Sequence, residues 1–281
     1  MHKLGHRAFC MRRFAQTAPS QPTLRSIRLP GGAGAWWQRA GFAGHLIGGV
    51  RFEPSDSTAV VGWTLSGGPG ARGADYTEGP GFWRVRDGNV FTGAVDRIPT
   101  IIEPADAVGE MDQQREHPNG ATGLHSVTLL SPDLHRTVQA LEEAGLQLRR
   151  LADPAPFSEA LSMAFFKMGG LIVELVAPRE RGANVALPGL PATPEDPEAP
   201  AAIVGMVVNV PSLERVADAA PGCVGRGRPA AQGKGRLIAS LRHEEAGSPP
   251  LRVAFMTPPS DVHGKLQLST RHCTTLFTIY S

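Results

Sequence analysis

Two short stretches decide the fold of this chain: Leu-His-Ser-Val-Thr-Leu-Leu-Ser-Pro-Asp-Leu at 124–134 and Leu-Ile-Val-Glu-Leu-Val-Ala-Pro at 171–178. The first predicts an apolar strand that runs into a helix, because Ser131 can cap the helix, a proline fits its first turn and Asp133 lies near its positive end. The second predicts a buried strand that is interrupted by one acid, Glu174. The two stretches open and close one structural unit.

The residues between these stretches complete that unit, which spans 120–178. Gly145 ends an amphipathic helix whose apolar side chains recur at positions i, i+4 and i+7. A strand over Leu146–Leu151 follows, and Gly169 and Gly170 join the last two strands as a hairpin. The unit is therefore a strand, a helix and three strands, which is a βαβββ order.

The same order returns about 80 residues later, over 201–258. Pro211 and Ser212 open the second helix as Pro132 opens the first, and the closing Phe-Met-Thr-Pro matches the earlier Leu-Val-Ala-Pro. Repetition at one spacing indicates an internal duplication. The predicted fold class is α+β, built from duplicated βαβββ units.

The rest of the chain surrounds these two units. Residues 22–65 show a partial copy, a degenerate βαββ unit in which His45–Phe52 is one strand. Glycine and proline make 66–119 a loop-rich connector. The proline-rich residues 179–200 are the expected linker between the copies, and 259–281 form a C-terminal tail.

Charge is unevenly placed along the chain. Eight basic residues and no acidic residue precede Glu53, whereas the residues from there on carry 20 basic and 26 acidic groups. An acid-free, arginine-bearing start that contains serine and threonine is typical of an organelle transit peptide, and Arg-Arg-Phe-Ala at 12–15 resembles a mitochondrial processing site. We therefore expect residues 1–21 to be a transit peptide or a disordered basic tail, and the protein to be mitochondrial, or otherwise cytoplasmic.

Composition excludes several classes of protein. Hydrophobic residues make up 41% and charged residues 19% of the chain, so it can bury a core and is not disordered throughout. The net charge of +2 gives no case for a nucleic-acid partner, and no apolar run reaches the ~18 residues of a membrane span. Three cysteines, at 10, 223 and 273, have no paired spacing, so neither a disulfide framework nor a cysteine zinc site is expected.

A repeated unit that opens with 124–134 and closes with 171–178 resembles the vicinal oxygen chelate (VOC) superfamily, and His-Pro-Asn-Gly at 117–120 resembles its bacterial glyoxalase-like members. The superfamily holds glyoxalase I, extradiol dioxygenases, fosfomycin-resistance enzymes and metal-free drug-binding proteins. The resemblance implies that two units curl their sheets around a shared cleft. In its metal-dependent members, a histidine on the first strand and a glutamate on the last strand of each unit bind a divalent ion there.

Carried onto this chain, the resemblance gives an incomplete ligand set. Glu174 occupies the last-strand position, and a glutamate in an apolar run is costly to bury unpaired. The family's first-strand histidine precedes the aspartate of the helix start by seven residues, which leads to Ser126, whereas His125 is eight residues away. In a regular strand this shift turns His125 to the face of Val127 and Leu129, under the helix, whereas a bulge before Ser126 would turn it inward, toward the cleft.

The second copy lacks the remaining ligands, because the corresponding positions hold Val204 or Gly205 and Ala254. His45 and His117 leave a rearranged site open. A catalytic ion usually needs about three protein ligands, so we expect no cofactor and weak or no binding of a divalent metal. If an ion does bind, the glutamate and the histidine of the first unit are the candidate ligands.

The candidate ligand-binding residues, besides Glu174, lie on two strands of the first unit. Ser126 and Thr128 share one face of the first strand. Either one of Phe165 and Phe166 faces the cleft as an apolar wall, or both rings belong to the core. The basic pairs Arg149-Arg150 and Lys234/Arg236 would select an anion if they line the cleft, although surface charges are the commoner case.

Two functions remain open at this point. The first is a glyoxalase-like protein that binds a small, partly apolar molecule between the units, with a lyase- or isomerase-type activity if it is an enzyme. The second is a non-catalytic, metal-free scaffold or assembly protein that kept the fold. Both readings leave room for a homodimer, and superfamily membership does not fix a reaction.

Overall fold

The structure is a computed structural model that describes residues 21–30, 34–55, 61–67, 84–85, 90–104, 115–187, 189–230, 233–242 and 250–260. The expected transit peptide, apart from Gln21, and nearly all of the expected C-terminal tail lie outside these ranges. No helix in the described ranges is both long enough and apolar enough to cross a membrane.

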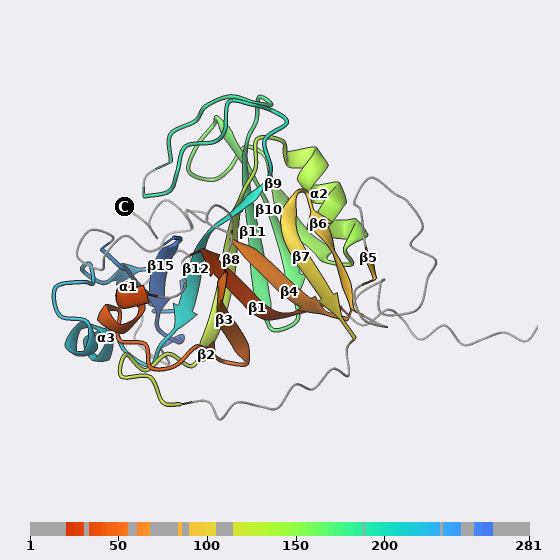
Figure 1. Ribbon diagram of the computed structural model, residues 1–281. Helices are drawn as coiled ribbons and strands as arrows, with labels where there is room; N and C mark the ends of the chain where they lie inside the picture. The colour runs from red at the N-terminus through yellow and green to blue at the C-terminus, as the bar shows by residue number, and fades with distance from the viewer. Residues whose placement is uncertain are drawn as a thin grey trace, which may run out of the picture.

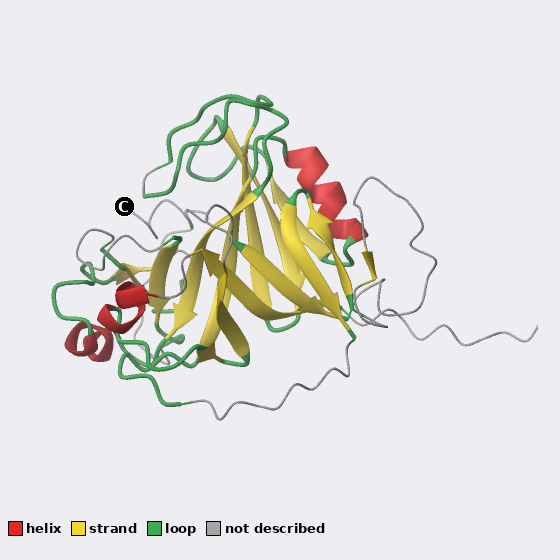
Figure 2. Ribbon diagram, viewed as in Figure 1, coloured by secondary structure: helices red, strands yellow, loops and turns green. Residues whose placement is uncertain are grey.

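The described residues form two mixed β-sheets with helices beside them (Figures 1 and 2). The elements of the N-terminal half are β1 (Thr23–Pro30), α1 (Gly34–Arg39), β2 (Leu46–Ile47), β3 (Val50–Ser55), β4 (Gly62–Ser66), β5 (Arg84–Val85), β6 (Phe91–Val95) and β7 (Ile98–Glu103). Those of the C-terminal half are β8 (Gly123–Leu130), α2 (Leu134–Glu143), β9 (Gln147–Ala152), β10 (Leu161–Met168), β11 (Leu171–Pro178), β12 (Ala202–Asn209), α3 (Leu213–Ala219), β13 (Arg228–Pro229), β14 (Leu237–Ser240) and β15 (Arg252–Met256).

The C-terminal sheet contains the predicted duplication. Its strand order is β13-β14-β15-β12-β8-β11-β10-β9, so each βαβββ unit places its first strand beside its last strand. β8 pairs with β11 and β12 pairs with β15, both in parallel, and the two units join edge to edge where β8 meets β12 antiparallel. The α+β fold of duplicated βαβββ units is thereby confirmed.

The helix starts differ in one detail from the sequence-based expectation. Asp133, rather than Ser131, caps α2, because its carboxylate accepts a hydrogen bond from the Arg136 backbone N–H at 3.0 Å. Ser131 instead bonds the Asp133 backbone and accepts a hydrogen bond from Thr137. In the second unit Ser212 caps α3, as the sequence predicts.

The N-terminal sheet is larger than the sequence suggests. Its order is β2-β3-β1-β4-β7-β6-β5, so three strands lie within residues 66–119, which were expected to be mainly a connector. Gly93 of β6 and Pro99 of β7 are residues that sequence patterns count against a strand, although the β6–β7 ladder continues through both. His45–Phe52 is not one strand either, because Gly48 and Gly49 both take a positive φ and fold it into the β2–β3 hairpin.

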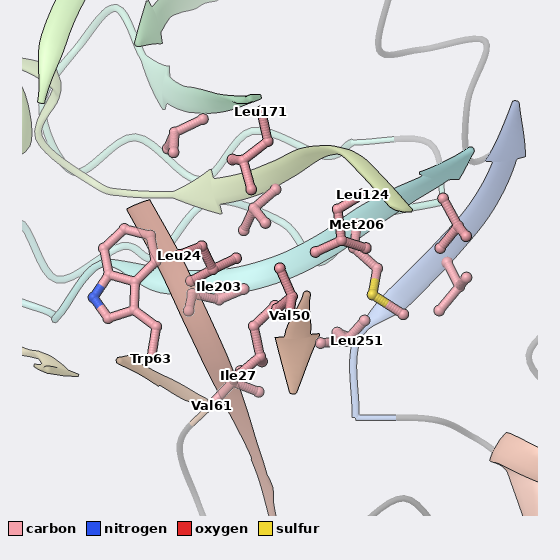
Figure 3. Close-up of a cluster of buried hydrophobic side chains, with 14 of the residues drawn as sticks. Leu24, Ile27, Val50, Val61, Trp63, Leu124, Leu171, Ile203, Met206 and Leu251 are labelled. Atoms are coloured by element: carbon pink, nitrogen blue, oxygen red, sulfur yellow. The ribbon is translucent and has the colours of Figure 1, made fainter. Parts of the chain in front are cut away.

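One hydrophobic core lies between the two sheets. Figure 3 shows Leu24, Ile27 and Trp63 of the N-terminal sheet close to Ile203 and Met206 of the C-terminal sheet, all of them buried. All three helices add side chains to this same core. A second, smaller cluster lies on the opposite face of the C-terminal sheet and includes Leu187 from the proline-rich linker.

Candidate functional site

The face of the C-terminal sheet that carries Glu174 is turned away from the N-terminal sheet, and we call it the Glu174 face. On it, Glu174 lies directly between Thr128 of β8 and Phe165 of β10. Ser126 lies between Ile172 of β11 and Val207 of β12. Three of the expected residues, Ser126, Thr128 and Glu174, are thus brought together, and each is at most 2% exposed.

A β-bulge changes the orientation expected for His125. The β8–β12 register pairs Ser126 with Val207 and Leu124 with Val208, which leaves His125 as an extra residue. The bulge allows Leu124 and Val127, three positions apart, to enter the same core between the sheets. The expectation of a regular strand is therefore wrong, and His125 does not share the face of Val127.

Five buried polar atoms in this region have no hydrogen-bond partner in the described part of the chain. They are His125 Nε2, Ser126 Oγ, Thr128 Oγ1, Glu174 Oε2 and Ser240 Oγ. Among the described residues, the one further atom of this kind is Trp36 Nε1. A buried polar group without a partner costs about 1–3 kcal/mol, so their concentration on one face indicates a place for water or a ligand.

Two titratable side chains on this face have strongly shifted pKa values. Burial raises the pKa of Glu174 to about 7, and the nearby Ser126 hydroxyl offsets this only in part, since no well-formed hydrogen bond joins the two side chains. Burial, followed by the positive charge of Arg236, lowers the pKa of His125 to about 4. At neutral pH the imidazole is therefore neutral, and the carboxyl group can both give and take a proton.

The side chains on this face do not fit a divalent metal ion. Across the units, Ser126 and Thr128 lie opposite Val207 and Gly205, and Ala254 lies opposite Val207, so these three positions of the second unit offer no metal ligand. The described residues contain no group of three or more His, Cys, Asp and Glu side chains that could hold an ion.

The histidines that left open a rearranged site lie elsewhere. His117 uses both ring nitrogens: Nδ1 accepts a hydrogen bond from the Ala43 N–H at 3.0 Å, and Nε2 bonds the Leu46 carbonyl at 2.8 Å. His45 is exposed and stacks near Trp37. The His-Pro-Asn-Gly motif thus joins the second half of the chain to the loop after α1 and provides no site.

An apolar pocket of about 330 Å³ lies at the β10–β11 hairpin. Phe165 and Phe166 both line it, together with Ile172 and the basic residues Arg149 and Lys167. Phe165 and Ile172 also flank the polar cluster, because they lie opposite Glu174 and Ser126. Phe166 belongs to the core between the sheets and is fully buried.

The sequence did not identify Ser240 as a site residue. It stands in β14 opposite Ala254, and Ala254 lies opposite Val207, so β15 and β12 separate it from Ser126, and its place on this face depends on strand order. The sequence marks Arg236, two residues before Ile238, only as one of several basic residues. Arg236 stands just before β14, and its positive charge contributes to the lowered pKa of His125.

Comparison with known proteins identifies the class of fold. No family model and no curated protein matches the chain. The structure is similar, with a TM-score of 0.56 and 9% identity, to a xylose isomerase-like TIM barrel/4-hydroxyphenylpyruvate dioxygenase fusion protein, over 89% of this chain and 50% of that one.

Two further structures give the same result. A Mn(II)-bound glyoxalase from Novosphingobium aromaticivorans has a TM-score of 0.51 and 10% identity, over 86% of this chain and 84% of that one. A mutant homoprotocatechuate 2,3-dioxygenase from Brevibacterium fuscum has a TM-score of 0.54 and 9% identity, over 86% and 72%. The chain therefore has the VOC fold, and at such identities the likeness concerns the fold alone.

Proposed function

We propose that this chain is a small-molecule-binding protein of the VOC fold that works without a divalent ion, and that Glu174 is its hydrogen-bonding and proton-transfer group. The observation that carries the proposal is the set of unpartnered polar atoms around Glu174. A bound molecule with hydrogen-bonding groups would satisfy these atoms and remove the cost of burying them alone.

The neighbouring side chains indicate the kind of molecule. Ser126 and Thr128 present hydroxyl groups that can donate or accept, beside the carboxyl group of Glu174. Phe165 and Ile172 provide apolar surface on the same face and border the pocket at the hairpin. The site therefore suits a small, partly apolar molecule with a carbonyl or hydroxyl group near its centre.

The chemistry that Glu174 supports is proton transfer. A group whose pKa is near 7 can accept a proton from a carbon next to a carbonyl group and return it to the same or a neighbouring atom. The hydroxyl of Ser126 or Thr128 would bond the carbonyl oxygen while negative charge develops on it. Such steps belong to isomerase- and lyase-type reactions.

One observation favours the alternative, a non-catalytic scaffold. Leu187 of the linker is buried in the cluster on the Glu174 face, with Val185 and Leu190 packed against that cluster. This segment covers part of the face, as it would in a protein that kept the fold for its stability alone. A ligand-binding experiment separates the two functions.

The test uses phenylacetone, a neutral ketone with an apolar ring, as the probe. NMR should show saturable binding to the wild-type protein, and faster exchange of the ketone's α-hydrogens for deuterium in D2O. Glu174→Gln should keep binding within about threefold and lose the added exchange, whereas Glu174→Leu should weaken binding about tenfold or more, since it removes the hydrogen bond. Glu142→Gln, at an exposed site on α2, should change neither. An absence of saturable binding would contradict the proposal and favour the scaffold.

A further inference from the structure

The polar side chains of the proposed site are closed off from solvent. Ser126 and Thr128 are 0% exposed, and Glu174 is 2% exposed. A ligand can therefore reach them only after a segment that covers the Glu174 face has moved. Outside the strands, the described residues that pack in the smaller apolar cluster of this face come from three places: the proline-rich linker, the loop between β9 and β10, and the residue after β13.

One part of the linker, which we call the linker loop (residues 183–193), is bonded to the linker itself and not to the sheet. Thr193 closes its base, because the Thr193 hydroxyl donates a hydrogen bond to the Ala183 carbonyl and accepts one from the Val185 N–H at 2.7 Å. In the described part of this loop, every hydrogen bond is formed within the linker. A compact loop whose ends are joined in this way can move as one piece.

The linker loop is held on the Glu174 face by apolar side chains. Leu187 is 6% exposed and belongs to the same apolar cluster as Val176, which stands two positions after Glu174 on β11 and therefore on the same face. Val185 and Leu190 pack against this cluster but are only half-buried. Since no described hydrogen bond joins the loop to the sheet, Leu187 provides its main attachment.

The other two segments that cover the face are hydrogen-bonded in place. In the loop between β9 and β10, the Ala155 N–H donates to the carbonyl of Leu161 in β10 at 2.7 Å. After β13, the Ala230 N–H donates to the Arg236 carbonyl at 2.9 Å, which continues the β13–β14 pairing. The linker loop is thus the covering segment that can leave without breaking a described hydrogen bond to the sheet.

Both ends of the linker loop are anchored to the rest of the fold. Before it, the Gly182 N–H donates to the Pro132 carbonyl at 3.1 Å, and Gly182 has a φ of 75°, which favours glycine at this turn of the backbone. After it, Arg136 of α2 donates to the carbonyls of Pro197 and Ala199 at 2.6 and 2.7 Å. Fixed ends and a self-contained middle are what a hinged lid requires.

We infer that the linker loop is a lid over the Glu174 site, which opens to admit the ligand and closes again when Leu187 returns to the apolar cluster. The inference rests on the proposed function for the site beneath the lid. It also gives the burial of Leu187 a role in ligand binding, whereas in a scaffold the same burial would serve stability alone.

Thiol labelling measures the opening without any ligand. In a background with Cys10, Cys223 and Cys273 replaced by serine, Leu187→Cys places a thiol on the lid, and Leu175→Cys, at a fully buried position of β11, is the matched control. Urea unfolding first confirms that each variant is folded. The thiol on the lid should react with an aromatic disulfide reagent at least about 100-fold faster than the control thiol, and low urea should leave its rate unchanged, because local opening exposes little surface. Equal rates that both rise with urea would overturn the lid.

Binding of phenylacetone shows whether the opening serves the site. Leu187→Ala should raise the association rate, measured from NMR line shapes, about tenfold, because a larger fraction of the protein is then open. Leu151→Ala removes an exposed leucine of β9 and should stay within about twofold of the wild type. An association rate in Leu187→Ala equal to that of the control would show that the ligand enters by another route, which also overturns the lid.

The outcomes separate this inference from the proposed function. If phenylacetone binds and the Leu187 variants behave like their controls, the lid is overturned and the small-molecule function stands. If phenylacetone binds neither to the wild type nor to Leu187→Ala, the proposed function is overturned and the lid with it.

Discussion

Glu174 illustrates how surroundings, rather than residue type, decide what a side chain does. It stands in an apolar strand with Phe165 on one side and Thr128 on the other, and it is 2% exposed. Without a cation beside it, the carboxyl group keeps its proton to a higher pH than usual. The same residue in a metal-binding relative of this fold would be ionised.

Replacing Glu174 by glutamine should change how stability depends on pH. Because the pKa of Glu174 is raised from 4.5 to about 7 in the folded state, the unfolded chain releases this proton first. The stability of the wild type therefore falls as the pH rises from about 4.5 to 7, by roughly 3 kcal/mol from this group. Glu174→Gln lacks this loss and should gain that amount relative to the wild type between pH 4.5 and 8.

Urea unfolding at several pH values measures this difference. The opposite trend of His125, whose lowered pKa makes stability fall as the pH drops from 6.5 toward 4, is common to both proteins and cancels. Parallel stability profiles for the wild type and the glutamine variant would show that Glu174 titrates normally.

His117 should prove structural rather than catalytic. It is 1% exposed and bonds backbone groups of Ala43 and Leu46 through its two ring nitrogens. His117→Ala should therefore lower the free energy of unfolding by about 2–4 kcal/mol. His135→Ala, at an exposed position of α2, should cost at most about 0.5 kcal/mol. Equal losses for both variants in denaturant unfolding would contradict this role.

Among the helices and strands, the sequence predicts those features that a local pattern of residues determines. The βαβββ units were predictable because proline, helix stripe and strand recur at one spacing, and Glu174 was predictable because an acid stands out in an apolar strand. The bulge at His125 was not, because it depends on burying Leu124 and Val127 against a distant sheet. The position of Ser240 depends on strand order, which local sequence does not contain.

A set of polar contacts around Arg136 of α2 connects the two halves of the fold. Arg136 Nε contacts Asp96 Oδ1 at 2.6 Å, and its other nitrogens donate to the carbonyls of Pro197 and Ala199. Asp96 follows β6 and is almost fully buried, and Thr137 also bonds it. These contacts therefore link the N-terminal sheet, α2 and the proline-rich linker.

Removing Arg136 should destabilise the protein strongly. Arg136→Met leaves the buried carboxylate of Asp96 without its cation, which costs about 3 kcal/mol or more. Arg97→Met, which removes an exposed pair with Glu198, should cost less than about 1 kcal/mol. Adding Asp96→Asn to Arg136→Met should recover part of the loss in denaturant unfolding, and no recovery would show that the carboxylate charge is not the cause.

The two halves of the molecule share one hydrophobic core. Side chains of both sheets and all three helices form one continuous cluster, which includes Trp63 of one sheet and Ile203 of the other. Separating the halves would expose this apolar surface to water. The duplicated units are thus recognisable in sequence and topology, but the folded state is stabilised by contacts that involve both halves of the chain. The expected mitochondrial targeting of the N-terminal segment stays a prediction.

The two halves should therefore unfold together. Trp36, Trp37 and Trp63 belong to elements of the N-terminal half and are buried, so their fluorescence follows the unfolding of that half. Far-ultraviolet circular dichroism reports on both halves. The two signals should give the same midpoint in urea. Midpoints that differ by more than the experimental error would indicate that each half is stable by itself.

The central claim is that this VOC-fold protein has a site that works without a divalent ion, since two of the four expected ligand positions carry hydrocarbon side chains or glycine. The most direct measurement is calorimetric titration of the folded protein with Mn²⁺, Zn²⁺, Ni²⁺ and Fe²⁺. We predict no saturable binding tighter than roughly 1 μM, which corresponds to about 8 kcal/mol. Stoichiometric binding tighter than that, abolished by Glu174→Ala or His125→Ala but unchanged in Glu142→Ala, would contradict the account.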